Sequence, residues 1–476
     1  MDDSRPPEPS GSIDGHTDTD PPTAESPATT RTRRQTLALA VGVTAATAGC
    51  SGVLPARTRA VDTGDWATPG GTPAGTYASD GDASTTADDL RRRFHVETPD
   101  LSGSTRGVEP VVHDGTVYVG WHPSPTFDAA TGRQRAALGP LDAPPAVTTQ
   151  TPYRNATLVG VRTVEPSTGP PNYGREQALV GLNPTPSVDD GLRVRWRFPD
   201  TGGAFGHWGG DGVSPLTVAD GTVFAGGSWQ HPDGTQRAGV VALSAADGEP
   251  EWTYPVPDDL ATDDSPASGD DDRGPDWYPA TRPAVRDGTV YAVDALRRVH
   301  AVDAATGALE WIQSSTADGA LSGRTVVATP SVILLLGDER VVGLDPSDGG
   351  ELWRQRLDGH LADAGGRFAG AVADGRLIVV VTPEDGSQAV VALDTESGRE
   401  LWRRQIDALT GLPTVADGRV YLSAYDDIRC LDAGDGRRRW RVLGDEDASP
   451  YGTPVPAEGG LYVVGYGSLT AFEREA

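Results

Sequence analysis

A short unit of two strands joined by an Asp-Gly turn recurs along the chain, and this repetition constrains the fold more than any other feature. One copy runs from Pro110 to Tyr118, with Asp114 and Gly115 at its turn. Asp-Gly between alternating apolar residues is the strongest short-range signal for a β-hairpin, because both turn positions require positive φ. Further copies surround Asp220-Gly221, Asp287-Gly288, Asp374-Gly375, Asp417-Gly418 and, more loosely, Glu458-Gly459.

A second repeated unit is a strand ending in Asp, a turn that closes on Gly, and a strand that carries Trp. Residues 302–311 form a clear copy, with Asp303 and Gly307 in the turn. The five clear copies end in Trp252, Trp311, Trp353, Trp402 and Trp440, which lie 38–59 residues apart. One hairpin of each kind fits this interval, and four strands in about 40–50 residues is the length of a β-propeller blade.

The number of blades follows from the weaker units near the two ends. Residues 127–132 form a unit without Trp, and residues 182–196 form a lengthened one, so that seven units precede the last hairpin. The chain then ends after three strands of an eighth unit, whereas residues 90–96 are a strand without partners, in which Phe94 occupies the Trp position. If the strand at residues 90–96 pairs with the last three strands, it completes the eighth blade and covers an exposed sheet edge. We predict an all-β, eight-bladed propeller of four-stranded antiparallel blades, closed by this N-terminal strand, with seven blades as the alternative.

The repeated aromatic residues are predicted to be structural. Large side chains at the same place in each unit pack most simply as wedges between blades. The predicted wedges are Phe94, Trp196, Trp252, Trp311, Trp353, Trp402 and Trp440. The repeated aspartates are interpreted as turn residues that bond their own backbone.

These units resemble the repeats of the PQQ-like propeller family, which includes quinoprotein alcohol dehydrogenases and the propeller lipoproteins of outer-membrane assembly. The resemblance covers residues 90–473. It implies for the enzymes a quinone and calcium in the central funnel, with a vicinal disulfide, a calcium-binding set and an aspartate base. The two cysteines here, Cys50 and Cys430, are not adjacent, and no residue set matches the calcium motif. We therefore predict no cofactor, no metal and no catalytic residue.

The N-terminal region has the pattern of an export signal that follows a disordered leader. Residues 1–30 are acidic and rich in Pro, Ser and Thr, which predicts disorder. Arg33 and Arg34 precede an apolar stretch, residues 37–48, that is too short to span a membrane and is typical of an export signal. The arginine pair resembles a twin-arginine signal, and the Ala-Gly-Cys ending resembles a lipobox that would place a lipid on Cys50. A buried hydrophobic helix is the alternative.

The predicted domains follow from these patterns. Residues 1–50 are the leader and export signal, residues 51–88 a flexible tether, and residues 89–476 the propeller. Trp66 stands out in the tether, and we expect it to dock across the propeller surface. The predicted location is the outer face of the cytoplasmic membrane, at the cell surface.

The net charge of −28 comes from 68 acidic and 40 basic residues, and every basic residue is arginine. A chain without lysine cannot form a Walker phosphate loop or a lysine Schiff base. Nucleic-acid binding is excluded because it needs clustered cations. Such acidity suits solubility in molar salt, where the Debye length is ~3 Å. We predict a halophilic protein that loosens at low salt; recruitment of basic partners or metal ions is the alternative.

Aromatic residues also gather in the connections between predicted strands, and loops on a rigid scaffold often carry binding function. The candidate binding rim comprises Trp121, His122, Phe205, His207, Trp208, Trp229, His231, Trp277 and Tyr278. Irregular core packing is the alternative. Asn155 begins an Asn-Ala-Thr sequon at a predicted hairpin tip and is a candidate for glycosylation.

Together these features predict a non-catalytic, surface-tethered propeller, monomeric, that docks a protein partner outside the cytoplasmic membrane. The alternatives are an exported PQQ-dependent oxidoreductase with a diverged site and a glycan-binding propeller. A calcium-like acidic cluster deep in the central channel would favour the oxidoreductase. An open face lined by aromatic residues would favour partner or glycan binding.

Overall fold

The computed structural model describes residues 65–79, 90–98, 108–120, 124–139, 141–148, 156–163, 177–183, 194–199, 205–206, 216–230, 236–256, 282–294, 297–313, 325–362, 370–406, 409–443, 452–465 and 467–474. All regular elements in these ranges are β-strands. Within them, accordingly, no helix is long and apolar enough to cross a membrane.

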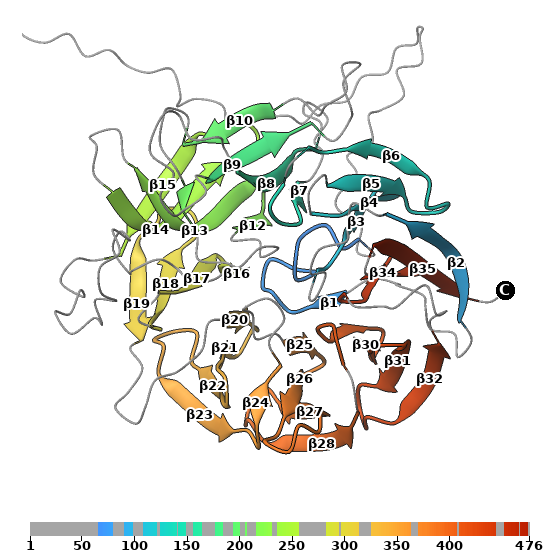
Figure 1. Ribbon diagram of the computed structural model, residues 1–476. Coiled ribbons are helices and arrows are strands. Elements are labelled where there is room, and N and C mark those ends of the chain that lie inside the picture. The colour runs from blue at the N-terminus through green and yellow to red at the C-terminus, as the bar shows by residue number, and fades with distance from the viewer. Residues whose placement is uncertain are drawn as a thin grey trace, which may run out of the picture. The chain divides into compact units, whose positions relative to one another are not determined.

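The first four blades follow one another along the chain (Figure 1). Blade 1 contains β3 (Val111–His113), β4 (Thr116–Tyr118), β5 (Pro125–Asp128) and β6 (Gln134–Ala137). Blade 2 contains β7 (Ala146–Val147), β8 (Leu158–Thr163), β9 (Gln177–Leu182) and β10 (Val194–Phe198). Blade 3 contains β12 (Leu216–Ala219), β13 (Thr222–Gln230), β14 (Gln236–Ser244) and β15 (Pro250–Pro255). Blade 4 contains β16 (Ala284–Arg286), β17 (Thr289–Val293), β18 (Val299–Asp303) and β19 (Leu309–Gln313). The short β11 (Phe205–Gly206) pairs with β9 and β13 and so joins blades 2 and 3 into one nine-stranded sheet.

The other four blades complete the ring. Blade 5 contains β20 (Thr325–Ala328), β21 (Ile333–Leu336), β22 (Arg340–Leu344) and β23 (Glu351–Arg356). Blade 6 contains β25 (Gly370–Ala373), β26 (Arg376–Thr382), β27 (Ala389–Asp394) and β28 (Glu400–Gln405), with β24 (His360–Leu361) added beside β26. Blade 7 contains β29 (Thr414–Ala416), β30 (Arg419–Ser423), β31 (Asp427–Asp432) and β32 (Arg438–Leu443). Blade 8 contains β33 (Val455–Ala457), β34 (Gly460–Gly465), β35 (Ser468–Arg474) and β2 (Leu90–Glu97).

The eight-bladed prediction is confirmed, as is closure by the N-terminal strand, because β2 is the outer strand of blade 8 and pairs antiparallel with β35. The predicted Asp-Gly hairpins also form. Asp287, for example, has a φ of 49° and Gly288 a φ of 84°. Asp tolerates this left-handed region better than most residues, and Gly adopts it freely.

The wedge residues connect each blade to the next. Five indole Nε1 groups donate to a backbone carbonyl in the following blade, at 2.9–3.0 Å. Trp353 is one of these donors, and its acceptor is the carbonyl oxygen of Thr395. The same ring lies against Gly398, where even a β-carbon would clash with it. The turn glycine therefore leaves room for the indole of the preceding blade.

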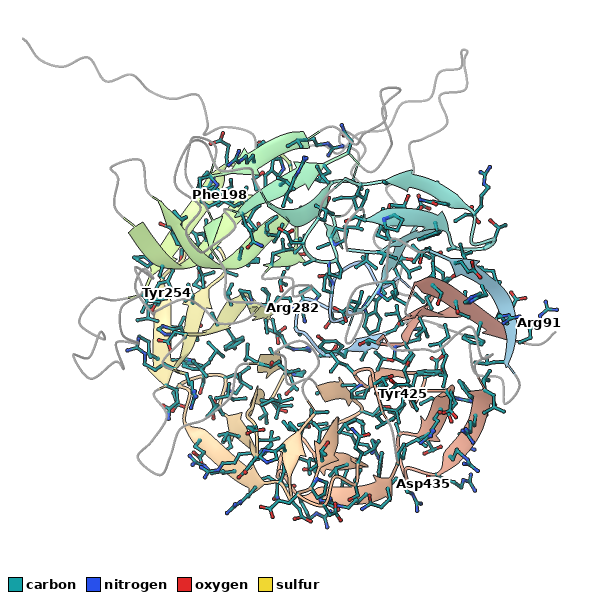
Figure 2. All side chains as sticks on the ribbon, in the orientation of Figure 1. Arg91, Phe198, Tyr254, Arg282, Tyr425 and Asp435 are labelled. Atoms are coloured by element: carbon teal, nitrogen blue, oxygen red, sulfur yellow. The ribbon has the colours of Figure 1, made fainter. Side chains whose placement is uncertain are left out.

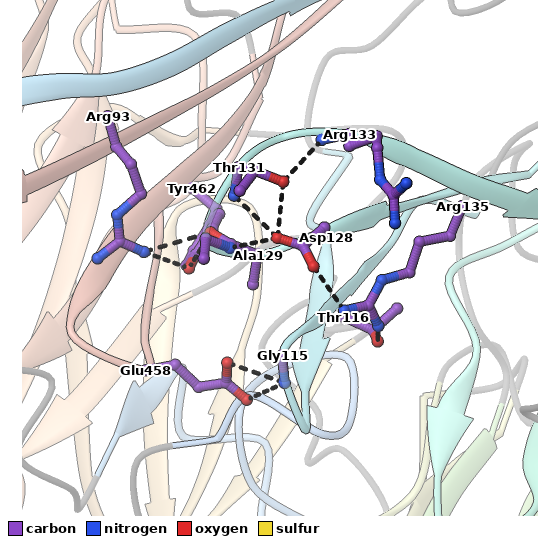
Figure 3. Close-up of polar contacts among 11 residues, drawn as sticks. Arg93, Gly115, Thr116, Asp128, Ala129, Thr131, Arg133, Arg135, Glu458 and Tyr462 are labelled. Carbon is purple, nitrogen blue, oxygen red and sulfur yellow. Dashed lines mark hydrogen bonds and ion pairs between the residues drawn. The ribbon is translucent and has the colours of Figure 1, made fainter.

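Phe94 occupies the same place at the closing junction between blades 8 and 1, against Gly132. A phenyl ring cannot donate a hydrogen bond, and at this junction two neighbouring side chains donate to the blade 1 carbonyl in its place. Arg93 Nη1 donates to the carbonyl of Ala129 at 3.2 Å, and the Tyr462 hydroxyl donates to the same oxygen at 3.1 Å (Figure 3). The hydrogen bond to the next blade's carbonyl is therefore kept at this junction, although its donors are Arg93 and Tyr462 and not an indole.

Strand alternation divides the turns between two faces of the ring. Within a blade the strands run antiparallel, so the first and third turns leave at one end, and the second turn and the link to the next blade leave at the other. We call the first end the hairpin face; it carries the turns at 114–115, 220–221, 287–288, 374–375, 417–418 and 458–459. The opposite end is the connection face.

Candidate functional site

The centre of the ring holds a piece of the same chain, residues 65–79, which we call the central segment (Figure 1). It makes backbone hydrogen bonds to the innermost strands of six blades. Trp66 forms an antiparallel bridge with Val112 of blade 1. The further acceptors on the segment are the carbonyls of Ala67, Pro73, Ala74, Thr76 and Tyr77, which bind amides of blades 2, 4, 5, 6 and 7. Its last residues form β1 (Ala78–Ser79), parallel to β29 of blade 7.

These contacts repeat because the blades repeat. The innermost strand of a blade has one edge with no neighbour in its own sheet, and buried amides need an acceptor. Val112, Val285, Val372 and Val415 each lie two residues before a turn residue, and each donates its amide to the central segment at 2.7–3.0 Å. The segment therefore satisfies equivalent amides in different blades.

Two charged residues fix the turns of the central segment. The carboxylate of Glu109, which is fully buried, accepts a hydrogen bond from the amide of Gly70 at 2.8 Å. The guanidinium of Arg282 lies over the Tyr77 ring, 5.8 Å from its centroid. Figure 2 places Arg282 near the middle of the ring. Gly70 has a φ of 80°, and a β-carbon there would meet Arg282, so only glycine suits this position.

A cavity of about 1050 Å³ lies on the hairpin face beside the central segment. Thr72, Pro73, Ala74 and Thr76 form one wall, and the turns of blades 3 to 6 form the rest. Its acidic lining residues are Asp220, Asp287, Asp303, Asp374 and Glu396. Its basic lining residue is Arg286, whose Nε lies 3.3 Å from a carboxylate oxygen of Asp287. The mouth of the ring on this side is therefore strongly acidic.

Three titratable residues meet where the central segment enters between blades 8 and 1. His113 Nδ1 lies 2.7 Å from Asp65 Oδ2, and the Glu458 carboxylate accepts from the amide of Gly115 at 3.0 and 3.1 Å. Burial, reinforced by the nearby Asp65 carboxyl, raises the pKa of Glu458 above its usual value. This cluster joins the segment to both blades of the closing junction.

A second cluster lies between blades 3 and 4. The Tyr254 hydroxyl is 3.0 Å from His300 Nδ1, and His300 Nε2 is 3.0 Å from Asp294 Oδ2. Arg298 Nε donates to the same carboxylate oxygen at 2.6 Å. Burial raises the pKa of Tyr254 to about 12. All four residues are buried and line neither the central cavity nor the closing junction, so we interpret the cluster as structural.

The structure describes few of the predicted rim residues. Phe205 and Trp229 come together as register partners in the β11–β13 pair. Trp229 is only 3 % exposed and packs against Phe198, with ring centroids 6.5 Å apart. Trp229 therefore lies in the core between blades 2 and 3 and not on an exposed rim, as the core-packing alternative predicts. Outside the described residues lie Trp121, His122, His207, Trp208, His231, Trp277, Tyr278, Arg33, Arg34, Cys50 and Asn155.

Trp66 docks elsewhere than expected. It is fully buried inside the ring rather than laid across the outer surface, because the free edges of the inner strands are the strongest available partners for an extended segment. Glu109, Arg282 and Thr395 were not singled out from the sequence. Arg282 and Glu109 stand just before a Pro and a first strand, and only ring closure brings them to the centre.

The residues at the centre do not fit a quinone with calcium. Pyrroloquinoline quinone is a polycarboxylate, and the cavity surrounds it with carboxylates and one guanidinium that already has a partner. The acidic residues also come from three blades around a wide cavity. Across the part of the chain that the structure describes, no three His, Cys, Asp or Glu side chains are grouped so as to hold a metal ion.

Comparisons with known proteins agree with the fold. The model of a family described as outer membrane protein assembly factor BamB matches residues 187–360 and 337–476. The quinohemoprotein alcohol dehydrogenase of Comamonas testosteroni superposes with a TM-score of 0.59 at 16 % identity, covering 87 % of this chain and 81 % of the other. A europium-containing methanol dehydrogenase gives a TM-score of 0.57 at 12 % identity, covering 87 % and 98 %. BamB of Moraxella catarrhalis gives 0.49 at 15 % identity, covering 81 % and 100 %. No curated protein matches the chain significantly.

Proposed function

Because the matched residues make up most of the chain, it belongs to the family of the outer membrane protein assembly factor BamB, and we propose that it is a non-catalytic scaffold propeller that docks a protein partner. The observation that carries this proposal is the central segment. A funnel that the chain fills with its own backbone, bonded to six blades, is built as a structural hub. Its acidic cavity suits neither the quinone nor the calcium of the propeller dehydrogenases.

The connection face is the side on which we place the partner. The turns of the hairpin face are short and uniform, whereas the links β4–β5, β10–β12, β13–β14 and β15–β16 differ in length and carry the candidate aromatic residues. Variable loops on a rigid scaffold are where binding function is usually found. Trp and Tyr are also the residues that most often dominate the energy of protein interfaces.

Export and anchoring complete the proposal. The arginine pair at Arg33 and Arg34 and the cysteine at Cys50 support an exported lipoprotein on the outer face of the cytoplasmic membrane. The partner is then a protein of the same membrane surface. Mass spectrometry of the membrane-bound protein tests this directly, because a lipid on Cys50 adds a defined mass to an N-terminal peptide that begins there.

The decisive experiment is crosslinking in intact cells followed by affinity capture. We expect one specific partner to be retained by the native chain and lost in a Trp121→Ala, Trp208→Ala, Trp277→Ala variant. Tyr425→Ala is the control, because Tyr425 lies in a β30–β31 turn of the same face and is 53 % exposed. Equal capture by all three proteins would overturn the placement of the interface. Dye reduction by the purified protein with quinone, calcium and an alcohol would overturn the non-catalytic role.

A further inference from the structure

The acidic cavity on the hairpin face has features of a binding site. Asp220, Asp374 and Glu396 make no ion pair or side-chain hydrogen bond with other described residues, although they surround one hollow. Carboxylates held at a common mouth raise the local concentration of cations, and low-dielectric walls strengthen this effect. Asp220 and Asp374 begin Asp-Gly turns, so the propeller repeat brings them to this face, and a role in binding needs a second observation.

The hydroxyl of a buried residue is an independent observation at the same place, and it is not among the solvent-inaccessible atoms that lack a partner. Thr395 is 4 % exposed and lines the cavity. Its amide donates to the carbonyl of Gly375, and its carbonyl accepts from Trp353 Nε1. Its hydroxyl makes no hydrogen bond with any residue that the structure describes. A polar side chain that is buried beside a cavity and has no protein partner is suited to a ligand's donor.

The size of the cavity and the spacing of its acids decide the class of ligand. The volume of about 1050 Å³ is at the upper end of small-molecule sites, which span roughly 300–1,000 Å³. Carboxylates from blades 3, 4 and 6 face it, and no group of three acidic or His side chains among the described residues converges on a point. One metal ion would therefore leave most of them without a partner. Several guanidinium or ammonium groups on one extended chain would reach them together.

We propose that this cavity binds an arginine- or lysine-bearing segment of the protein partner, with Asp374, Glu396 and the Thr395 hydroxyl as acceptors. This inference rests on the proposed function, since it names the chemistry of the partner that the scaffold holds. It adds a second contact, on the hairpin face, to the aromatic contact on the connection face. Both contacts lie on a rigid ring, so a partner that engages both gains in effective concentration.

A labelled oligoarginine peptide is the probe, with an oligoglutamate peptide as its negative counterpart. We expect saturable binding by fluorescence anisotropy that weakens as salt is raised, because Asp374 and Glu396 are exposed and their charges are screened. The combination of Asp374→Asn and Glu396→Gln should weaken binding roughly tenfold or more. Thr395→Val, which keeps the shape of the side chain, should weaken it by several fold through loss of one acceptor.

The matched control removes the same charge from the same face outside the cavity, by Glu249→Gln and Asp435→Asn. Asp435 lies toward the outer edge of the ring (Figure 2). Equal weakening by the two pairs would overturn the inference in favour of diffuse attraction, and so would displacement of the peptide by micromolar calcium. Near-native tryptophan emission of each variant verifies folding, and Asn is suited to the positive φ of 50° at residue 374.

The two proposals fail separately. Specific partner capture that survives Asp374→Asn with Glu396→Gln, together with no oligoarginine binding, would reject the cavity and leave the scaffold function intact. Cavity-dependent peptide binding without any captured partner would reject the scaffold function.

Discussion

Arg93 donates to the carbonyl oxygen of Ala129 at the one blade junction where the wedge is a phenylalanine, and so takes the role that an indole plays at five others. The same guanidinium also binds Glu473 on β35 and the carbonyl of Gly459 in the β33–β34 turn. One cation with several acceptors therefore joins blade 8 to blade 1, beside the backbone pairing of β2 with β35.

Loss of Arg93 should open this junction. Arg93→Leu removes charge-assisted hydrogen bonds from a side chain that is only 18 % exposed, so we expect the free energy of unfolding to fall by about 2–4 kcal/mol. Denaturant titration in molar salt measures it. Arg91→Leu is the control on the same strand, since Arg91 binds the same Glu473 but is 55 % exposed, and should cost less than about 1 kcal/mol. Equal losses would contradict a special role for Arg93.

The indole hydrogen bond can be isolated by comparing two wedges. Trp402 Nε1 donates to the carbonyl of Ala433, whereas Trp440 Nε1 is buried without a partner among the described residues. Trp440 is the more buried ring, so packing alone would make Trp440→Phe the costlier change, whereas loss of the indole hydrogen bond should make Trp402→Phe cost about 1 kcal/mol more. Thermal unfolding of the two variants side by side gives the difference. A larger cost for Trp440→Phe would show that the wedges act by packing alone.

Stability should depend on pH through Glu458. Its pKa is raised in the folded protein by burial, so the folded state holds the proton more tightly than the unfolded state does. The resulting stability is fully present below the ordinary pKa of 4.5 and is lost as pH rises through the folded pKa. Glu458→Gln should remove this dependence, which unfolding measurements from pH 4 to pH 8 would reveal.

Asp128 provides an internal comparison for this experiment. Its hydrogen bond from Arg135 lowers its pKa to about 2, so its contribution is lost only below the ordinary value of 3.8. Asp128→Asn should therefore leave the pH dependence above that value unchanged. A slope that survives in Glu458→Gln would place its origin in another group.

The central segment should contribute strongly to the stability of the whole ring. Trp66→Ala removes a fully buried indole, and we expect a loss of about 3–5 kcal/mol. Hydrogen exchange should accelerate at the amides of Val285, Val372 and Val415, whose acceptors lie on the segment. The amide of Val302, bonded within blade 4, should change far less. Uniform acceleration across all blades would indicate general unfolding instead.

Salt should stabilise the protein strongly. With a net charge of −28, self-repulsion destabilises the compact state, and molar salt shortens the Debye length to about 3 Å. We expect the midpoint of thermal unfolding to rise steadily from low salt to molar potassium chloride. A midpoint that does not change with salt would refute the halophilic interpretation.

The repeated part of the fold was predictable because each blade is built from local signals. Asp287-Gly288 specifies its turn through positive φ, and Phe94 could be aligned with the tryptophans by position alone. The centre was not predictable in this way. The partners of Trp66 and Tyr77 lie far along the chain, and their proximity exists only after eight blades have closed.

In the candidate site, too, the local turns could be predicted from the sequence but the arrangement of residues around the cavity could not. Asp374 begins the same Asp-Gly turn as its counterparts in other blades, so nothing in the local sequence separates it from residues whose role is to shape a turn. Thr395 stands where other blades have alanine or proline, and this difference alone does not indicate a cavity. Their common cavity arises from the position of the central segment, which fills one side of the ring and leaves the other open. For Trp229, in turn, an aromatic residue beside a loop gave no sign that it would be buried against Phe198 of the preceding blade.

The central segment also sets an order of events during synthesis. Residues 65–79 leave the ribosome early, but the amides that they bind are spread from Val112 to Val415. The segment can therefore gain its partners only one blade at a time, and contacts of such long sequence separation form slowly. A nascent chain stalled before blade 7 would lack the Tyr77–Val415 contact and the closing junction of blade 8, so assembly of this ring is expected to finish only after translation does.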